Sequence, residues 1–374
     1  MVEQAGINEE FKTQPTSTRE VILKLLILFA LVYLFILSIS LLGGAFKLFG
    51  KDFAKTIFQA TSNPIVGLMI GVLATSIVQS SSTTTSLIVS LVASGALSYE
   101  SSIAMVMGAN IGTSVTNTVV SLGHISRGEE FKRAFSGSIV HDFFNISSVI
   151  VLLPLQIYFN VIGKTAIFME EIFAGFGGMK FSSPLKAITK PVAKYIIHLT
   201  GDSALITILI SVIFLFIALH FIVRVLKSMV LARVEKFFQR YIFRTPVLSL
   251  ILGVALTVLV QSSSITTSVV VPLIGAGVIT VTQIYPYVLG ANVGTTITAF
   301  LASFVTGSHG GVAVAFTHLI FNIFGIAIFW PLKRIPIWMA EKMSELTQRS
   351  KLIPLLYIIV VFFIIPGMII YFFN

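Results

Sequence analysis

Apolar residues run along this chain in long blocks, separated by short polar or charged stretches. Seven of these blocks are, at about 20 residues, long enough to cross a bilayer as helices. We predict the spans at residues 24–46, 101–123, 135–158, 203–226, 283–306, 311–331 and 352–373. The first block has no charge from Leu25 to Phe46, and no small-residue cleavage site follows it, so we interpret it as a retained span. The pattern therefore predicts an all-α polytopic membrane protein.

Two further apolar segments, 62–98 and 245–281, are each interrupted by a block of polar residues. The first block reads QSSSTTTS at 79–86, and the second reads QSSSITTS at 261–268. The arms on either side are about 17 residues long, which is short for a full span, and Ser and Thr loosen helices by bonding to nearby backbone. We favour two re-entrant helical hairpins with the QSSS motifs at their tips over two pairs of full crossings.

The two hairpins belong to an internal duplication. An offset of 182 residues relates the QSSS blocks and also carries GANIGTSVT at 108–116 onto GANVGTTIT at 290–298. Further along, HDFFN at 141–145 corresponds to HLIFN at 318–322. The predicted parts are a cytoplasmic tail (1–20), repeat 1 (21–158), an external linker (159–201), repeat 2 (202–332), and a basic interfacial segment with a final transmembrane helix (333–374).

Three crossings separate the first hairpin from the second, and this odd number gives the two repeats opposite orientations in the membrane. Loop charge provides an independent check. With the N-terminus inside, 17 of the 25 Lys and Arg residues fall on cytoplasmic stretches and 8 on external stretches, in agreement with the positive-inside rule. Seven crossings would place the C-terminus outside.

Composition supports the membrane assignment and excludes several chemistries. The chain is 56% hydrophobic and 11% charged, and its mean hydropathy is +0.97, well outside the range of soluble proteins. It has no cysteine, which excludes disulfides, thiol catalysis and thiolate metal sites. The net charge of +10 resides in loops between apolar segments, so it does not indicate a nucleic-acid partner; the lipid bilayer is the expected one.

The polar tips suit ion binding. Inverted repeats with broken helices are the architecture of secondary transporters, which bind their substrate where the repeats meet. Half-helix N-termini attract anions, while hydroxyl and carbonyl oxygens suit a hard cation such as Na⁺. Neither the hairpins nor the two spans after each contain Arg or Lys. The charge of a bound anion must then be met by N–H groups and bound cations, which predicts obligatory cation coupling.

The GANIG and GANVG segments combine two roles. Gly108 and Gly290 begin small-xxx-small spacings, which allow helices to approach closely. The asparagine amides are costly in hydrocarbon if they are unpaired, so we favour Asn110 and Asn292 as cation ligands or as residues supporting them. We expect His141 and His318 to form hydrogen bonds within the core rather than to bind a metal.

Asp142 lies inside an apolar run and has Leu319 as its counterpart in the second repeat. An ionised carboxylate there is expensive and needs a partner. That partner is either a bound sodium ion or, alternatively, a nearby Ser, Asn or His.

Paired QSSS blocks, each followed by a GANIGTS-like span, resemble the type II sodium-dependent phosphate cotransporter family, in a bacterial form. The resemblance covers about 60–155 and 244–332. It implies uptake of inorganic phosphate, mainly as the divalent ion, driven by sodium as the coupling ion and without another cofactor. It also implies that an Asp at the position of Asp142 accompanies an additional sodium ion and electrogenic transport. A multi-pass protein of the inner or plasma membrane is expected, and a homodimer is left open.

The resemblance assigns phosphate to both QSSS motifs: Gln79, Ser80, Ser81, Ser82, Gln261, Ser262, Ser263 and Ser264. Our candidate sodium ligands are Thr83, Thr84, Asn110, Thr113, Asn117, Asp142, Asn145, Thr266, Asn292, Thr295 and Asn322. We expect no transition metal.

Three alternatives stay open. Nothing in the residues themselves separates phosphate from another oxyanion or a dicarboxylate. An intramembrane serine hydrolase would need one nucleophile, whereas the duplication supplies two equivalent blocks, neither with a G-x-S-x-G elbow. A passive channel would neither saturate nor require sodium.

Overall fold

The computed structural model describes residues 18–176, 182–241 and 245–373, and within them every regular element is a helix. Seven helices or helix pairs are long and apolar enough to cross a membrane, at the places predicted. They are α1 (Thr18–Leu48), α5 with α6 (Tyr99–Gly112 and Val115–Ser121), α7 (Glu129–Phe159), α10 (Ala204–Tyr241), α14 (Val281–Thr306), α15 (His309–Phe329), and α17 with α18 (Ile353–Ile359 and Ile365–Phe373). The predicted tail 1–20 falls almost entirely outside the described residues.

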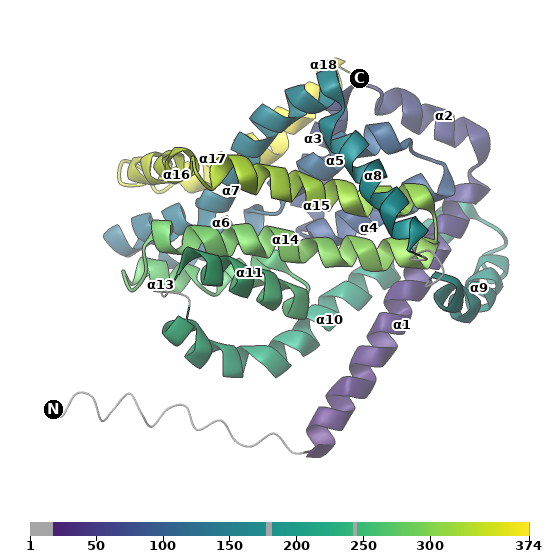
Figure 1. Ribbon diagram of the computed structural model, residues 1–374, viewed down its shortest axis with the longest axis horizontal. Coiled ribbons are helices and arrows are strands. Elements are labelled where there is room, and N and C mark those ends of the chain that lie inside the picture. The colour runs from purple at the N-terminus through teal and green to yellow at the C-terminus, as the bar shows by residue number, and fades with distance from the viewer. Residues whose placement is uncertain (1–17, 177–181, 242–244, 374) are drawn as a thin grey trace.

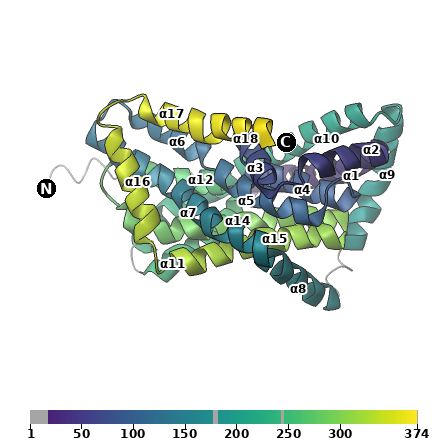
Figure 2. The same ribbon diagram turned by 90° about the horizontal axis from the view of Figure 1, so that it is seen from above.

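The remaining helices are shorter. They comprise α2 (Gly50–Ala60), α3 (Pro64–Val78), α4 (Ser81–Ser94), α8 (Val161–Gly175), α9 (Ser182–Leu199), α11 (Pro246–Val260), α12 (Ser263–Ser268), α13 (Val271–Gly275) and α16 (Arg334–Leu346). In Figure 1, α14 and α15 lie side by side across the molecule, and α1 runs past them at a steep angle. Figure 2 shows α16 across one end of the molecule, and α17 and α18 along one edge.

Both polar segments break at the QSSS motif into a first and a second helical arm. The first arms, α3 and α11, start in the same way, with a side-chain cap followed by proline at the first helical position. Asn63 Oδ1 accepts the backbone N–H of Ile65 at 2.9 Å, and Thr245 Oγ1 accepts that of Leu248 at 3.2 Å. Each first arm is 15 residues long, too short to span the hydrocarbon core alone.

The second arms differ. In the first segment, α4 continues unbroken for 14 residues, whereas its counterpart divides into α12 and α13. Pro272 stands at the start of α13. It has no N–H for the helical ladder, and its ring clashes with the carbonyl four residues earlier, so the helix breaks there. The opposite asymmetry occurs one span later, where α5 and α6 are separate but α14 is continuous.

Glycines set the packing of each first arm on the span that follows, as their spacing predicts. A Cβ at Gly108 of α5 would overlap the backbone carbonyl oxygen of Leu68 in α3. The same holds for Gly290 of α14 against Leu250 of α11. No larger residue fits while the backbones lie this close, so these contacts fix the position of each QSSS tip.

Candidate functional site

The two QSSS tips have the same backbone conformation. Gln79 ends α3 and Gln261 ends α11 in the left-handed region, at φ values of 55° and 60°. The next residue is extended in both, with Ser80 at φ −151°, ψ 103° and Ser262 at φ −151°, ψ 110°. Its hydroxyl then caps the second arm: Ser80 Oγ accepts the Thr83 N–H at 3.2 Å. Ser262 Oγ likewise accepts the N–H of the residue three positions on, at 3.3 Å.

A left-handed glutamine is an unusual way to end a helix. Glycine or asparagine normally takes this position, because a Cβ there costs roughly 1–2 kcal/mol. Both first arms nevertheless end in glutamine. Since strain of this kind persists at functional sites, the two glutamine side chains are the first candidates for contact with a ligand.

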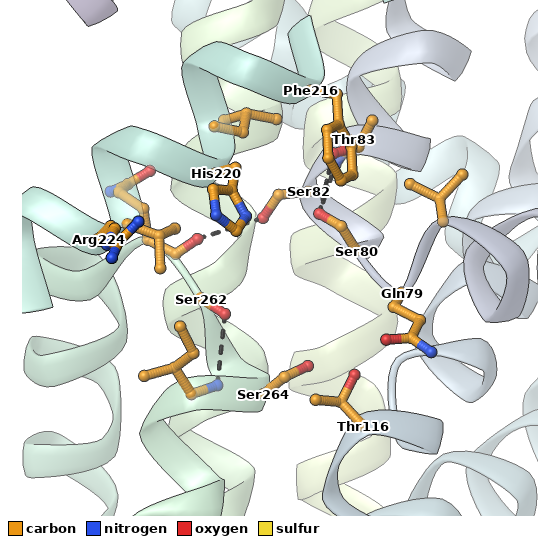
Figure 3. Close-up of a pocket in the computed structure, with 15 residues that line it drawn as sticks. Gln79, Ser80, Ser82, Thr83, Thr116, Phe216, His220, Arg224, Ser262 and Ser264 are labelled. Carbon is orange, nitrogen blue, oxygen red and sulfur yellow. Dashed lines mark hydrogen bonds between the residues drawn. The ribbon is translucent and has the colours of Figure 1, made fainter. Parts of the chain in front are cut away.

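The two tips border one cavity of about 590 Å³, which we call the QSSS pocket. Figure 3 shows Ser80 and Ser82 from the first motif and Ser262 and Ser264 from the second around this space. Six of the eight predicted phosphate ligands line it: Gln79, Ser80, Ser82, Gln261, Ser262 and Ser264. The other two, Ser81 and Ser263, are buried and do not line the pocket.

Hydrogen bonds connect the tips to each other and to the spans. The Ser82 hydroxyl donates to the backbone carbonyl of Gln261 at 3.5 Å. The side-chain oxygen of Gln261 accepts from Thr298 at 2.9 Å. Ser264 donates to the carbonyl of Thr113 at 3.3 Å. These hydrogen bonds connect parts of the pocket wall that lie far apart in the sequence.

Two residues of this pocket were missed by the sequence analysis. Arg224 and His220 of α10 both line it. Figure 3 shows them across the pocket from Gln79 and Thr116. The sequence analysis expected N–H groups and bound cations alone to meet the charge of a bound anion. It did not consider Arg224, because α10 lies outside the segments searched for Arg and Lys. The only available signal was the spacing of Phe216, His220 and Arg224, four residues apart and so on one face of a helix.

The predicted asparagines do not line the QSSS pocket. Three of them form a reciprocal network with the two histidines. His141 Nε2 contacts the side-chain oxygen of Asn292, and His318 Nε2 contacts that of Asn110 at 3.1 Å. Asn145 bridges them, since it donates to the Asn110 carbonyl at 3.0 Å and accepts from Asn292 at 2.9 Å. The histidines therefore form hydrogen bonds within the core, as predicted.

Asn322 extends this network, whereas Asn117 bonds outside it. Asn322 donates to the Asn292 carbonyl at 3.2 Å, and Asn117 donates to the Thr267 hydroxyl at 2.7 Å. Their side-chain oxygens are buried and have no partner among the described residues. An amide oxygen in that condition is suited to a cation.

The threonine candidates behave differently. Thr83 lines the QSSS pocket and donates to Ser80 Oγ at 2.9 Å. The others donate their hydroxyls to the backbone carbonyl four residues earlier: Thr84, Thr113, Thr266 and Thr295. Back-bonded hydroxyls still have lone pairs for a cation, but nothing in their geometry requires one.

Asp142 is fully buried; Tyr357 of α17 is its hydrogen-bond partner, and the hydroxyl of the nearby Ser114 also lies beside its carboxylate. The tyrosine hydroxyl donates to Oδ2 at 3.0 Å. The other carboxylate oxygen has no hydrogen-bond partner in the described chain, and the Ser114 hydroxyl lies beside the carboxylate without meeting hydrogen-bond geometry. A π-helical turn, Val360–Ile364, follows Tyr357, and such turns often mark functional sites.

A polytopic helical fold in which two broken helical segments bring polar side chains to one cavity defines a membrane transport protein. The chain belongs to the Na⁺/Pi-cotransporter family, whose profile matches residues 34–184 and 213–369. The family and the relatives described next are transporters rather than enzymes, which removes the serine hydrolase alternative.

Two relatives illustrate the similarity. Sodium-dependent phosphate transport protein 2A of Rattus norvegicus is 33% identical over 447 residues, covering 96% of this chain and 70% of the relative. Sodium-dependent phosphate transport protein 2B of Homo sapiens is 32% identical over 442 residues, covering 92% of this chain and 64% of the relative. No solved structure matches the chain.

Proposed function

We propose that this protein is a sodium-coupled symporter that takes up inorganic phosphate, mainly as the divalent ion, across the inner or plasma membrane. The observation that carries the proposal is the convergence of two identically shaped QSSS tips on one cavity. Sodium-dependent phosphate transport in the named relatives supports the choice of both ions.

The pocket provides three kinds of donor for a phosphate. The first is the Gln79 amide, together with the second N–H of the Gln261 amide, whose nitrogen also donates to the Val258 carbonyl at 2.5 Å. The second is the start of α4, where N–H groups without an intrahelical acceptor and the helix dipole favour an anion; the start of α12 repeats this arrangement over a shorter helix. The third is Arg224, which contributes one formal positive charge. A divalent anion therefore keeps a net negative charge that bound sodium would offset.

We propose that the two repeats have inverted topology and that access alternates around the two tips. The ends of the hairpins support this arrangement. Residues Ala93 and Ser94 at the end of α4 border the same cavity as Thr306 at the end of α14. Ile274 of α13 instead borders a cavity with Val281 at the start of α14. The hairpins thus open toward opposite ends of one membrane-spanning helix.

The decisive experiment is uptake of radiolabelled phosphate into proteoliposomes. We expect saturable accumulation with an inward sodium gradient, and none when potassium replaces sodium. Excess sulfate or succinate should leave uptake unchanged, because those anions represent the alternative substrates. Equal uptake in both salts would contradict symport and favour a passive channel.

Asp142 is our candidate for the ligand of an additional sodium ion, because one carboxylate oxygen lacks a partner among the described residues. Three sodium ions with one divalent phosphate would carry one net positive charge inward. Asp142→Gly should then reduce or remove the inward current that phosphate evokes, while some sodium-dependent uptake persists. Tyr357→Phe is the control, since it removes only the donor to Oδ2 and should keep the current. If wild-type uptake ignores a potential imposed with valinomycin, the electrogenic proposal fails.

A further inference from the structure

A second cavity, of about 370 Å³, lies apart from the QSSS pocket and has a basic wall. Three lysines line it: Lys47 of α1, and Lys190 and Lys194 of α9. Three hydroxyl side chains also line it, Ser40, Ser94 and Thr306, and no lining residue is acidic. We call this cavity the lysine pocket.

The lysines of this pocket stand on a packed pair of helices. The hydroxyls of Ser40 in α1 and Thr189 in α9 form a hydrogen bond of 2.9 Å. A Cβ at Gly44 would lie 2.7 Å from Cδ1 of Ile197, so the glycine allows α9 to lie directly on α1. The positions of the charged groups are therefore fixed by the fold, although their side chains are solvent-exposed.

No acidic side chain in the described part of the protein neutralises these positive charges through an ion pair. Its ion pairs involve other basic residues, and none of the three lysines forms one there. Two helices, α4 and α14, end at the pocket, and each terminus carries about half a negative charge. One carbonyl near each of these ends already has a partner, since the Gly95 N–H bonds to Val92 at 3.1 Å and the Gly307 N–H to Ser303 at 3.0 Å. Three full positive charges against about one negative charge leave the pocket strongly positive.

We propose that the lysine pocket binds an anion that carries a phosphate group, either inorganic phosphate or the headgroup of an anionic phospholipid. The ammonium groups supply point charges and rotatable N–H donors for such a ligand. The three hydroxyls add polar lining only, because each already donates to a backbone carbonyl of its own helix. The affinity for anions does not depend on the transport activity proposed above, but the outward position of the pocket rests on the proposed topology. An external cluster of lysines also runs against the positive-inside bias, which indicates that it serves something other than orientation.

The chain contains no cysteine, so a single introduced thiol can report on this pocket. Lys194→Cys should react faster with an anionic methanethiosulfonate reagent than with a cationic one, because two lysines remain beside it. For two positive charges at a separation of about 8 Å in water, the anionic reagent gains about fivefold over a neutral one and about 30-fold over the cationic one, before screening by salt. The matched control is Lys164→Cys, on an exposed position of α8 that does not line the pocket, where the two rates should be closer.

The ligand is tested in sodium-free buffer, which separates this pocket from a sodium-dependent transport site. In neutral phosphatidylcholine vesicles, inorganic phosphate should slow the anionic reagent at Lys194→Cys, and adding Lys47→Gln and Lys190→Gln should abolish that protection. If the pocket instead holds a lipid headgroup, vesicles containing phosphatidylglycerol should slow the reaction without added phosphate. The proposal would be overturned if the ratio of anionic to cationic reaction rates were equal at Lys194→Cys and Lys164→Cys, and if neither phosphate nor phosphatidylglycerol slowed the reaction.

Discussion

The substitution Gln79→Gly distinguishes two properties of this residue: the conformational strain of its left-handed backbone, and the contribution of its side-chain amide to phosphate binding. Gln79 is left-handed at φ 55°, and in the described part of the chain its side chain forms no hydrogen bond. Glycine adopts this conformation freely, which relieves roughly 1–2 kcal/mol of strain. Glycine also loosens the unfolded chain, which costs about 0.4–1 kcal/mol. The free energy of unfolding should therefore be unchanged or rise by up to about 1.6 kcal/mol.

Transport should respond very differently. If the Gln79 amide donates to the phosphate, its loss removes a hydrogen bond to a charged group, which contributes about 1.5–3 kcal/mol. That corresponds to a roughly 10- to 100-fold rise in apparent KM for phosphate. The assays are thermal unfolding in detergent and initial uptake rates in proteoliposomes over a range of phosphate concentrations.

Two variants serve as controls. Gln79→Ala keeps the left-handed strain and loses the amide. Its KM for phosphate should therefore match that of Gln79→Gly, whereas its free energy of unfolding should not gain from relief of strain. Asp202→Gly makes the same change at another left-handed residue, with φ 56°, away from the QSSS pocket, and should leave transport unchanged. A wild-type KM in Gln79→Gly would refute the reasoning, as would a loss of stability of several kcal/mol, which would assign the side chain a structural role.

Three further predictions test the rest of the assignment. Arg224→Gln should raise the apparent KM for phosphate about tenfold, while Arg224→Lys should recover most of the loss; an unchanged KM in the first variant would remove Arg224 from the site. Gly290→Ala should destabilise the protein by about 1–3 kcal/mol through overpacking, measured by thermal unfolding, whereas Gly123→Ala, with nothing within 4 Å of the added carbon, should not. In intact cells an impermeant maleimide should label Lys164→Cys but not Lys342→Cys, and labelling of both would contradict the proposed topology.

The seven spans could be predicted because lipid leaves few alternatives to a long apolar helix, and the helix breaks at the two QSSS motifs could be predicted from their polar residues. Which tip residues face the pocket could not. Successive helical residues are turned by about 100°, so Ser81 and Ser263 lie between neighbours that line the pocket and yet are themselves excluded. Arg224 was counted as a cytoplasmic loop charge, because its place on the pocket wall depends on how α10 packs. Tyr357 was beyond prediction for the same reason, since it pairs with a residue 215 positions away.

The reciprocal network of histidines and asparagines also has a consequence for biosynthesis. His141 and Asn145 meet Asn292 only after another 151 and 147 residues, respectively, have been made. At about 5–20 residues per second, the ribosome needs roughly 7 to 30 seconds to supply that partner. During this interval the first half of the chain holds imperfectly satisfied polar groups in or near the bilayer, a state that costs free energy. A chain truncated before α14 would keep those groups exposed permanently, which offers membrane quality control a direct way to distinguish it from a chain still being synthesised.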